Sequence, residues 1–211
     1  LSQFLEINQS NRSVLIVSGA RQVGKTTLID HVLAKASRKC VRIDLEKSPS
    51  FAEKIDRTEN FQEFESLLMD EHSFSPNEGM ALFIDESQIS KKLGTYIRFM
   101  KEDWQNAFVI LSGSLIGELH NEDVRRPVGR EKFLEMWPFS FKEFLLALGH
   151  DSLVSTISNF HIGDNISDHI HKRILDDFNI YLKVGGLPAV VESYKNKRNW
   201  QDSLLDIYKT Y

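Results

Sequence analysis

The sequence predicts an α/β fold followed by a smaller region made only of helices. A loop with two glycines and a lysine, residues 19–27, joins a strand-like run to a helix-like run. Strand-like and helix-like segments then alternate as far as residue 137, and only helical patterns follow Pro138. We therefore expect an α/β domain over residues 1–137 and a helical domain over residues 138–211.

The first strand is predicted at residues 13–18, an apolar run with β-branched residues, and the first helix at residues 26–34, where apolar residues recur at helical spacing. Between them, Gly19-Ala-Arg-Gln-Val-Gly-Lys-Thr-Thr27 matches G-x-x-x-x-G-K-[ST], a loop that binds nucleotide phosphates. The fixed positions coincide by accident in about one chain in a hundred of this size. Because strand, loop and helix also follow in the required order, we favour a phosphate-binding loop over a glycine turn with a surface lysine.

The residue types of this loop indicate its chemistry. Its backbone N–H groups would converge on the phosphates, and the first turn of the helix would add the positive end of its dipole. Lys25 would reach the β and γ phosphates, and the Thr26 hydroxyl would hold Mg²⁺. The predicted nucleotide-binding residues of the loop are Gly19, Gln22, Val23, Gly24, Lys25, Thr26 and Thr27.

A second strand is predicted at residues 40–45, a helix at residues 61–69 and a polar loop at residues 72–79. Cys40 is the single cysteine and cannot form an internal disulfide. Because it lies in an apolar strand-like run, we expect a buried thiol in a reducing compartment.

Two adjacent acids close the next strand. The run Met80-Ala-Leu-Phe-Ile-Asp-Glu-Ser-Gln88 is typical of a buried central strand whose carboxyl end opens onto a site. Asp85 would hold Mg²⁺ through water, and Glu86 would position or deprotonate the attacking water. The alternative is a pair of solvated acids at a helix N-terminus, which the preceding phosphate loop makes the less favoured interpretation.

A helix over residues 89–104 and a buried strand over residues 107–112 follow. The Ser112 hydroxyl would contact the γ-phosphate or orient the water, or Ser112 is a simple turn residue; the sequence does not separate these interpretations. A polar loop, residues 121–130, contains three arginines and leads to a fifth strand at residues 131–136. We expect Arg125 and Arg126 to be solvated, whereas Arg130 is equally compatible with a solvated loop and with stabilising charge on the γ-phosphate.

The helical region begins with a strong boundary signal. Ser140 and the glutamate three residues later form a predicted capping box, and Gly149 is placed to end that helix. Helical patterns also occupy residues 170–184 and 189–195, with Gly185-Gly-Leu-Pro188 between them. Phe139, Phe141 and Phe144 are expected in a hydrophobic core rather than as a base-stacking surface.

Composition bounds the function. The formal charge of −4 and a pI near 6.0 argue against a broadly cationic nucleic-acid surface, and the cations at residues 195–198 are too few to supply one. No run reaches the roughly 18 apolar residues of a membrane helix, and no signal peptide is recognised at the start. We expect a cytoplasmic protein, and a fragment, because the chain opens on leucine and stops within an uncapped amphipathic pattern.

These motifs resemble those of an AAA+-like ATPase family. The matching segments are Gly19–Thr27, Phe83-Ile-Asp-Glu-Ser-Gln88, Ser112-Gly-Ser114, Gly129-Arg130 and Pro138-Phe-Ser-Phe-Lys-Glu-Phe-Leu145. Ala20 and Phe139 depart from the usual proline and leucine without touching the chemistry. The resemblance implies a P-loop NTPase fold of the ASCE type, a doubly wound parallel five-stranded sheet with an extra strand between the phosphate-loop strand and the Asp-Glu strand, followed by a small helical lid.

The same resemblance implies two further features. Gly185-Gly-Leu-Pro188 is similar to a motif in the lids of signal-transducing ATPases with numerous domains, where the proline touches adenine, so Pro188 joins the expected nucleotide site. Longer members carry a C-terminal domain with a nuclease-like fold.

The leading hypothesis is an ATPase that couples Mg·ATP hydrolysis to movement of the lid or of a partner. Lys25 and Arg130 would stabilise phosphate charge, Arg130 either in its own chain or from a neighbouring chain of a homo-oligomer, and Glu86 would activate water. The alternative is a nucleotide-dependent switch with little hydrolysis, binding ATP or ADP and linked to an unknown protein partner or to nucleic acid. A GTPase is disfavoured because no N-K-x-D motif occurs, and a small-molecule kinase because a water-activating acid would waste ATP.

Overall fold

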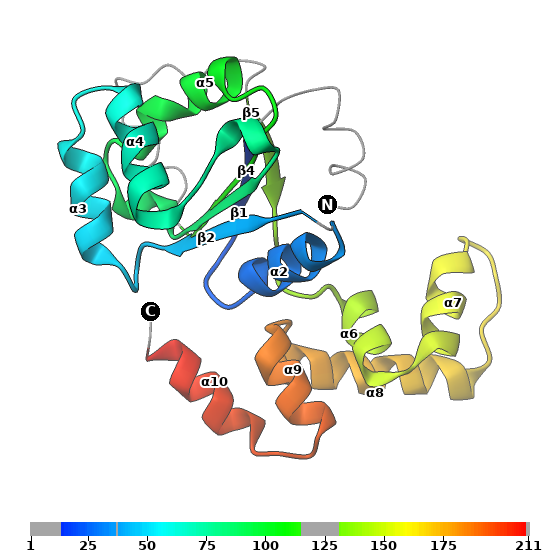
Figure 1. Cartoon of the computed structure of the whole chain (residues 1–211). Coiled ribbons are helices and arrows are strands. Elements are labelled where there is room, and N and C mark those ends of the chain that lie inside the picture. Colours follow the sequence, from blue (N-terminus) through cyan, green and yellow to red (C-terminus); the bar gives the residue numbers. More distant parts are fainter. Residues whose placement is uncertain (1–13, 37, 115–130, 210–211) are drawn as a thin grey trace. The chain divides into compact units, whose positions relative to one another are not determined.

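The computed structural model describes residues 14–36, 38–114 and 131–209 (Figure 1). The described residues form two compact units, the first ending at Met136 and the second beginning at Trp137. Each unit has its own hydrophobic core. No helix within the described ranges is long and apolar enough to cross a membrane.

The first unit is built on a five-stranded sheet in which all neighbouring strands are parallel, in the order β2-β3-β4-β1-β5. β4 lies between β1 and β3, where an additional strand was expected. The α/β fold with a parallel sheet is therefore confirmed. The strands are β1 Val14–Ser18, β2 Cys40–Asp44, β3 Ala81–Asp85, β4 Phe108–Gly113 and β5 Glu131–Glu135.

Helices cover both faces of this sheet (Figure 1). Successive side chains of a strand point to opposite faces, so Val14 and Ile16 of β1 join one core and Leu15 and Val17 join the other. The first core also takes residues from α3, α4 and α5, and the second takes residues from α2. Burial on both faces explains why the central strands are unbroken apolar runs. The helices of this unit are α2 Lys25–Lys35, α3 Pro49–Arg57, α4 Phe61–His72 and α5 Leu93–Asp103, with 3₁₀ turns η1 Pro76–Glu78 and η2 Ser87–Ile89.

Two features of this unit differ from the sequence expectation. The helix expected from residue 89 begins only at Leu93. The 3₁₀ turn η2 and the extended backbone of Ser90 lie between it and β3. Helix α3 was not expected at all, although Pro49 at its first turn is a known start signal.

Cys40 is a correction to the predicted buried thiol. It is exposed, because it opens β2, which lies at one end of the strand order. An edge strand is covered less completely than the central strands, so its apolar composition did not imply burial.

The second unit contains α6 Phe141–Leu148, α7 Asp151–Asn159, α8 Asp168–Val184, α9 Pro188–Lys195 and α10 Trp200–Tyr208. The predicted capping box is confirmed: the Glu143 N–H donates to Ser140 Oγ at 3.4 Å, and the Ser140 N–H donates to Glu143 Oε2 at 2.7 Å. Gly149 ends α6 in the left-handed conformation, with φ 83°. Phe144 is fully buried, and Phe139 and Phe141 pack against the same core, as expected.

The Gly185-Gly-Leu-Pro188 stretch separates α8 from α9. A Cβ at Gly186 would lie 2.3 Å from the Phe139 carbonyl oxygen, so only glycine allows this approach. The Phe139 N–H donates to the Gly186 carbonyl at 2.7 Å, which ties the start of the unit to this turn. Pro188 occupies the first turn of α9, where a missing N–H costs nothing.

Candidate functional site

The strand order brings the ends of three strands together at the carboxyl edge of the sheet. Ser18 at the end of β1 is in register with Gly113 of β4, and Ile84, next to the end of β3, is in register with Leu111 of β4. Residues that follow these strands therefore share one edge although they are far apart in the sequence. This is the edge at which open α/β sheets bind ligands.

The loop between β1 and α2 has the backbone of a phosphate-binding loop. Three of its residues have positive φ: Gly19 at 148°, Gln22 at 63° and Gly24 at 92°. A Cβ at Gly19 would lie 2.2 Å from the Met136 carbonyl oxygen, so this position requires glycine. Left-handed residues alternating with ordinary ones turn successive N–H groups toward a common concavity that suits an anion.

Helix α2 begins directly after this loop. Gly24 precedes its first residue, and the Leu28 N–H donates to the Gly24 carbonyl at 3.0 Å. The first N–H groups of a helix have no partner within it, so the N–H groups of Lys25, Thr26 and Thr27 are available to an anion. Val23 is the loop residue whose side chain is buried.

Lys25 lies folded over the loop. Its Nζ donates to the carbonyl oxygens of Gly19 at 2.8 Å and of Ala20 at 2.9 Å. The residue is only 5 % exposed. This burial lowers the pKa of Lys25, while the negative charges of Glu86 and Asp85 counter part of the effect. The ammonium is thus a desolvated cation already held above the loop, next to two acids.

Asp85 is the polar centre of the site. It ends β3, is 6 % exposed and accepts three hydrogen bonds. The Thr26 hydroxyl donates to Oδ2 at 2.7 Å, the Ser112 hydroxyl donates to Oδ1, and the Glu86 N–H donates to Oδ1 at 3.1 Å. A solvated acid would not be arranged in this way.

The pair formed by Thr26 and Asp85 has the donor chemistry that Mg²⁺ prefers. Magnesium binds hard oxygen ligands, takes one or two from the protein and keeps several waters. A hydroxyl and a carboxylate 2.7 Å apart beside the loop between β1 and α2 meet this requirement. The residues present therefore fit the ion that the sequence led us to expect.

Glu86 has an unusual backbone for a glutamate. Its φ of 50° and ψ of 44° are left-handed, and this turns the chain away from β3 into η2. Its carboxylate accepts a hydrogen bond from Gln88 Nε2 at 2.6 Å and a longer one from the Ser114 hydroxyl at 3.4 Å, both at Oε2. Both donors hold the same oxygen.

Ser112 lies within β4 rather than after it, which contradicts the turn interpretation. It is fully buried, and its hydroxyl is bonded to Asp85. Its carbonyl accepts a hydrogen bond from the Ser87 hydroxyl at 3.0 Å, which joins β4 to the segment after Glu86.

The other predicted site residues are distributed as follows. Gln22 and Thr27 belong to the loop and to the first turn of α2, with exposed side chains. Pro188 belongs to the second unit. Arg130 lies outside the described residues, as do Arg125 and Arg126.

Sequence reasoning assigned no role to Gln88 or Ser87. Gln88 was visible as the last residue of the F-I-D-E-x-Q segment, so its position relative to the acids was the available signal. Its contact with Glu86 accompanies the left-handed backbone of Glu86 itself, which composition does not reveal.

A comparison with known protein families identifies the family of this sequence. The sequence model of a family described as AAA domain matches residues 11–145. No curated protein matches. Among solved structures, that of C. elegans PCH-2 matches with a TM-score of 0.46 and 13 % sequence identity, over 91 % of this chain and 55 % of that one. This chain thus spans about half the length of that structure. Because the family match covers more than half of the sequence, the chain belongs to the AAA domain family of P-loop ATPases.

Proposed function

We propose that this chain binds Mg·ATP at the loop between β1 and α2 and hydrolyses it. The observation that carries the proposal is the network centred on Asp85, which joins Thr26 of the loop helix to Ser112 of β4 and stands beside Lys25 and Glu86. It assembles at one edge a cation for phosphates, oxygen ligands for a metal and a carboxylate for water.

Lys25 would bind the nucleotide by exchanging acceptors. Its Nζ now bonds the Gly19 and Ala20 carbonyls, and β and γ phosphate oxygens are stronger acceptors because they are charged. The N–H groups of Gln22, Val23 and Gly24 and those at the start of α2 would hold the remaining phosphate oxygens. This arrangement neutralises charge that develops on the γ-phosphate during transfer.

Thr26 and Asp85 would hold the magnesium ion, Thr26 through its hydroxyl and Asp85 through water. When bound, the ion neutralises charge on the β and γ phosphate oxygens. Ser112 and the Glu86 N–H keep the Asp85 carboxylate oriented by donating to its other oxygen. We assign Ser112 this supporting role in place of direct contact with the γ-phosphate.

Glu86 would act on the attacking water. Gln88 and Ser114 bind Oε2, so Oε1 is the oxygen that can accept a proton from water. The water oxygen bonds to the γ-phosphorus as the bond to the β–γ bridging oxygen breaks, and ADP leaves with that oxygen. We further propose that Arg130 stabilises the same charge, in this chain or in a neighbouring copy, and that Pro188 contacts adenine.

A nucleotide-dependent switch is the second candidate. The division of the chain into two compact units at Met136 supports it, because ATP and ADP can then favour different positions of a lid. In that case the bound nucleotide would control a protein partner, and hydrolysis would be slow.

The test measures ATP binding and hydrolysis by the chain and by its Lys25→Ala and Glu86→Gln variants. We expect Lys25→Ala to lose binding, and Glu86→Gln to bind ATP normally while turnover falls by about 100-fold. Equal turnover of Glu86→Gln and the parent chain would contradict the role of Glu86. Tight binding with no turnover in the parent, at every protein concentration, would favour the switch.

A further inference from the structure

The second unit contains a surface hollow of about 390 Å³ that the nucleotide site does not use. It lies between the C-terminal ends of α6 and α9, the middle of α8 and the start of α10, within the described residues of this unit. Its lining includes Lys195, Lys197 and Arg198, the cations that were too few for a nucleic-acid surface. Because they line one hollow, these three cations form a local positive surface.

The hollow has an excess of positive charge. Lys195, Lys197 and Arg198 are exposed, and no ion pair to them is found in the described part of the chain. The lining contains one acid, Asp177, which is buried and accepts a hydrogen bond from His150 Nδ1 at 2.9 Å. Three cations therefore face solvent around one carboxylate that is already bonded. Such a surface attracts anions.

The backbone that carries these cations is fixed. Lys197 has a φ of 54°, an uncommon left-handed conformation for lysine. The Lys197 N–H donates to the Tyr194 carbonyl at 3.0 Å, and the Arg198 N–H donates to the Ser193 carbonyl at 2.9 Å. Two hydrogen bonds thus pin the turn between α9 and α10. A partner would meet a surface that needs little ordering.

The remaining wall is apolar. Leu148, Tyr194 and Trp200 line the hollow, and all three pack against the core of the second unit. Tyr194 lies 6.3 Å from Phe144, ring centroid to ring centroid. Rigid aromatic side chains beside cations suit a ligand that has an apolar group next to negative charge.

We propose that this hollow docks an acidic peptide segment of a partner protein, with an aromatic or aliphatic side chain against Tyr194 and Trp200 and flanking carboxylates on Lys195, Lys197 and Arg198. A free small anion is a poorer fit, because small ligands are held in sites that bury most of their surface, whereas these cations are exposed. Single-stranded nucleic acid needs a charged groove along several nucleotides, whereas these cations lie within one turn.

The test is a binding titration of the whole chain without nucleotide, so its outcome does not depend on hydrolysis. The probe is a fluorescein-labelled peptide with Asp-Asp-Phe-Asp-Asp at its centre. The comparison probes are the same peptide with serine in place of phenylalanine, a peptide with lysine in place of each aspartate, inorganic phosphate and oligo-dT. The variant combines Lys195→Glu, Lys197→Glu and Arg198→Glu, which are exposed positions with little effect on folding expected.

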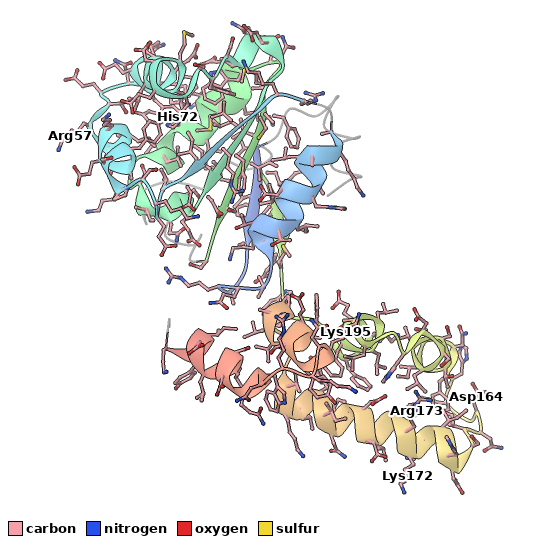
Figure 2. The ribbon with its side chains drawn as sticks, turned by 60° about the horizontal axis from the view of Figure 1, so that its bottom comes forward. Arg57, His72, Asp164, Lys172, Arg173 and Lys195 are labelled. Carbon is pink, nitrogen blue, oxygen red and sulfur yellow. The ribbon has the colours of Figure 1, made fainter. Side chains whose placement is uncertain are left out.

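A matched control applies the same charge change elsewhere on the unit. Lys172, Arg173 and Lys183 are exposed residues of α8 that do not line the hollow. Figure 2 shows Lys172 and Arg173 along α8, apart from Lys195. Reversing these three charges alters the net charge equally, so it reports general electrostatic attraction.

We expect the acidic aromatic peptide to bind, and the triple reversal at the hollow to weaken it by about ten-fold or more, as three lost rim contacts predict. The fold-weakening of binding caused by the α8 control should be less than half of that caused by the triple reversal at the hollow. The serine and lysine peptides should bind weakly. Equal weakening by both reversals, absent binding, or stronger binding of phosphate or oligo-dT would overturn the proposal.

Discussion

Gln88 offers the sharpest test of the site, because its effects on stability and on catalysis should separate. Its Nε2 donates to Glu86 Oε2 at 2.6 Å, a hydrogen bond to a charged acceptor. A carboxylate only accepts hydrogen bonds, so the amide nitrogen must face it and Oε1 is turned away. That Oε1 is buried and has no hydrogen-bond partner among the described residues.

The Gln88→Leu substitution removes both features at once. Losing the hydrogen bond to a charged group costs about 1.5–3 kcal/mol, and removing a buried unpaired acceptor recovers about 1–3 kcal/mol. The two terms nearly cancel, so the free energy of unfolding should change by less than about 1 kcal/mol. Glu86 nevertheless loses its orientation, and we expect kcat to fall by about 10- to 100-fold with ATP affinity unchanged.

Steady-state ATP hydrolysis and urea unfolding of the same preparations measure these two quantities. The matched control is Gln62→Leu, the same substitution at an exposed position of α4, which should change neither. Gln88→Glu adds a second test: it replaces the amide donor with a carboxylate that repels the charge of Glu86, so kcat should fall at least as far as in Gln88→Leu. An unchanged kcat in Gln88→Leu, or a loss of stability above about 2 kcal/mol, would refute the reasoning.

Three further predictions concern the same chain. Gly19→Ala should abolish nucleotide binding and lower the unfolding free energy by more than about 2 kcal/mol in urea titrations, because its Cβ would meet the Met136 carbonyl at 2.2 Å; full binding would contradict this geometry. Lys25→Met should change how stability depends on pH without nucleotide. The pKa of Lys25 is lowered in the folded state from 10.5, so the unfolded chain binds more protons and parent stability rises with pH up to 10.5. The stability of the variant relative to the parent should therefore shrink over that range, and a parallel pH dependence would disagree. Ser140→Ala should cost about 1 kcal/mol in thermal unfolding of the second unit, through loss of the α6 cap, whereas Ser140→Asp should retain most of it.

Local features were predictable from sequence because local physics determines them. The loop from Gly19 to Thr27 is recognisable by two glycines and a lysine between a strand and a helix. The positive φ values at Gly19 and Gly24 are ones that glycine adopts readily. The capping box of Ser140 and Glu143 lies within four residues. The parallel sheet was predictable for the same reason, because strands and helices alternate along the chain.

The features that were predicted wrongly or left open depended on neighbours distant in sequence. Cys40 is exposed because β2 ends the strand order, and its own apolar surroundings could not reveal that. Ser112 bonds Asp85 because β4 is inserted between β1 and β3, so strand order decided its role. The roles of Arg130 and Pro188 stay predictions.

The sequence by itself identified the residues of the predicted phosphate site: motif spacing alone singled out Lys25, Thr26, Asp85 and Glu86. Only the tertiary structure decided how they are held. Thr26 and Asp85 are 59 residues apart, and their hydrogen bond exists because parallel strands end at one edge. Gln88 contacts Glu86 where the backbone of Glu86 is left-handed. The residue types and their spacing can be read from the sequence, whereas the orientation of a side chain depends on which residues the fold packs beside it.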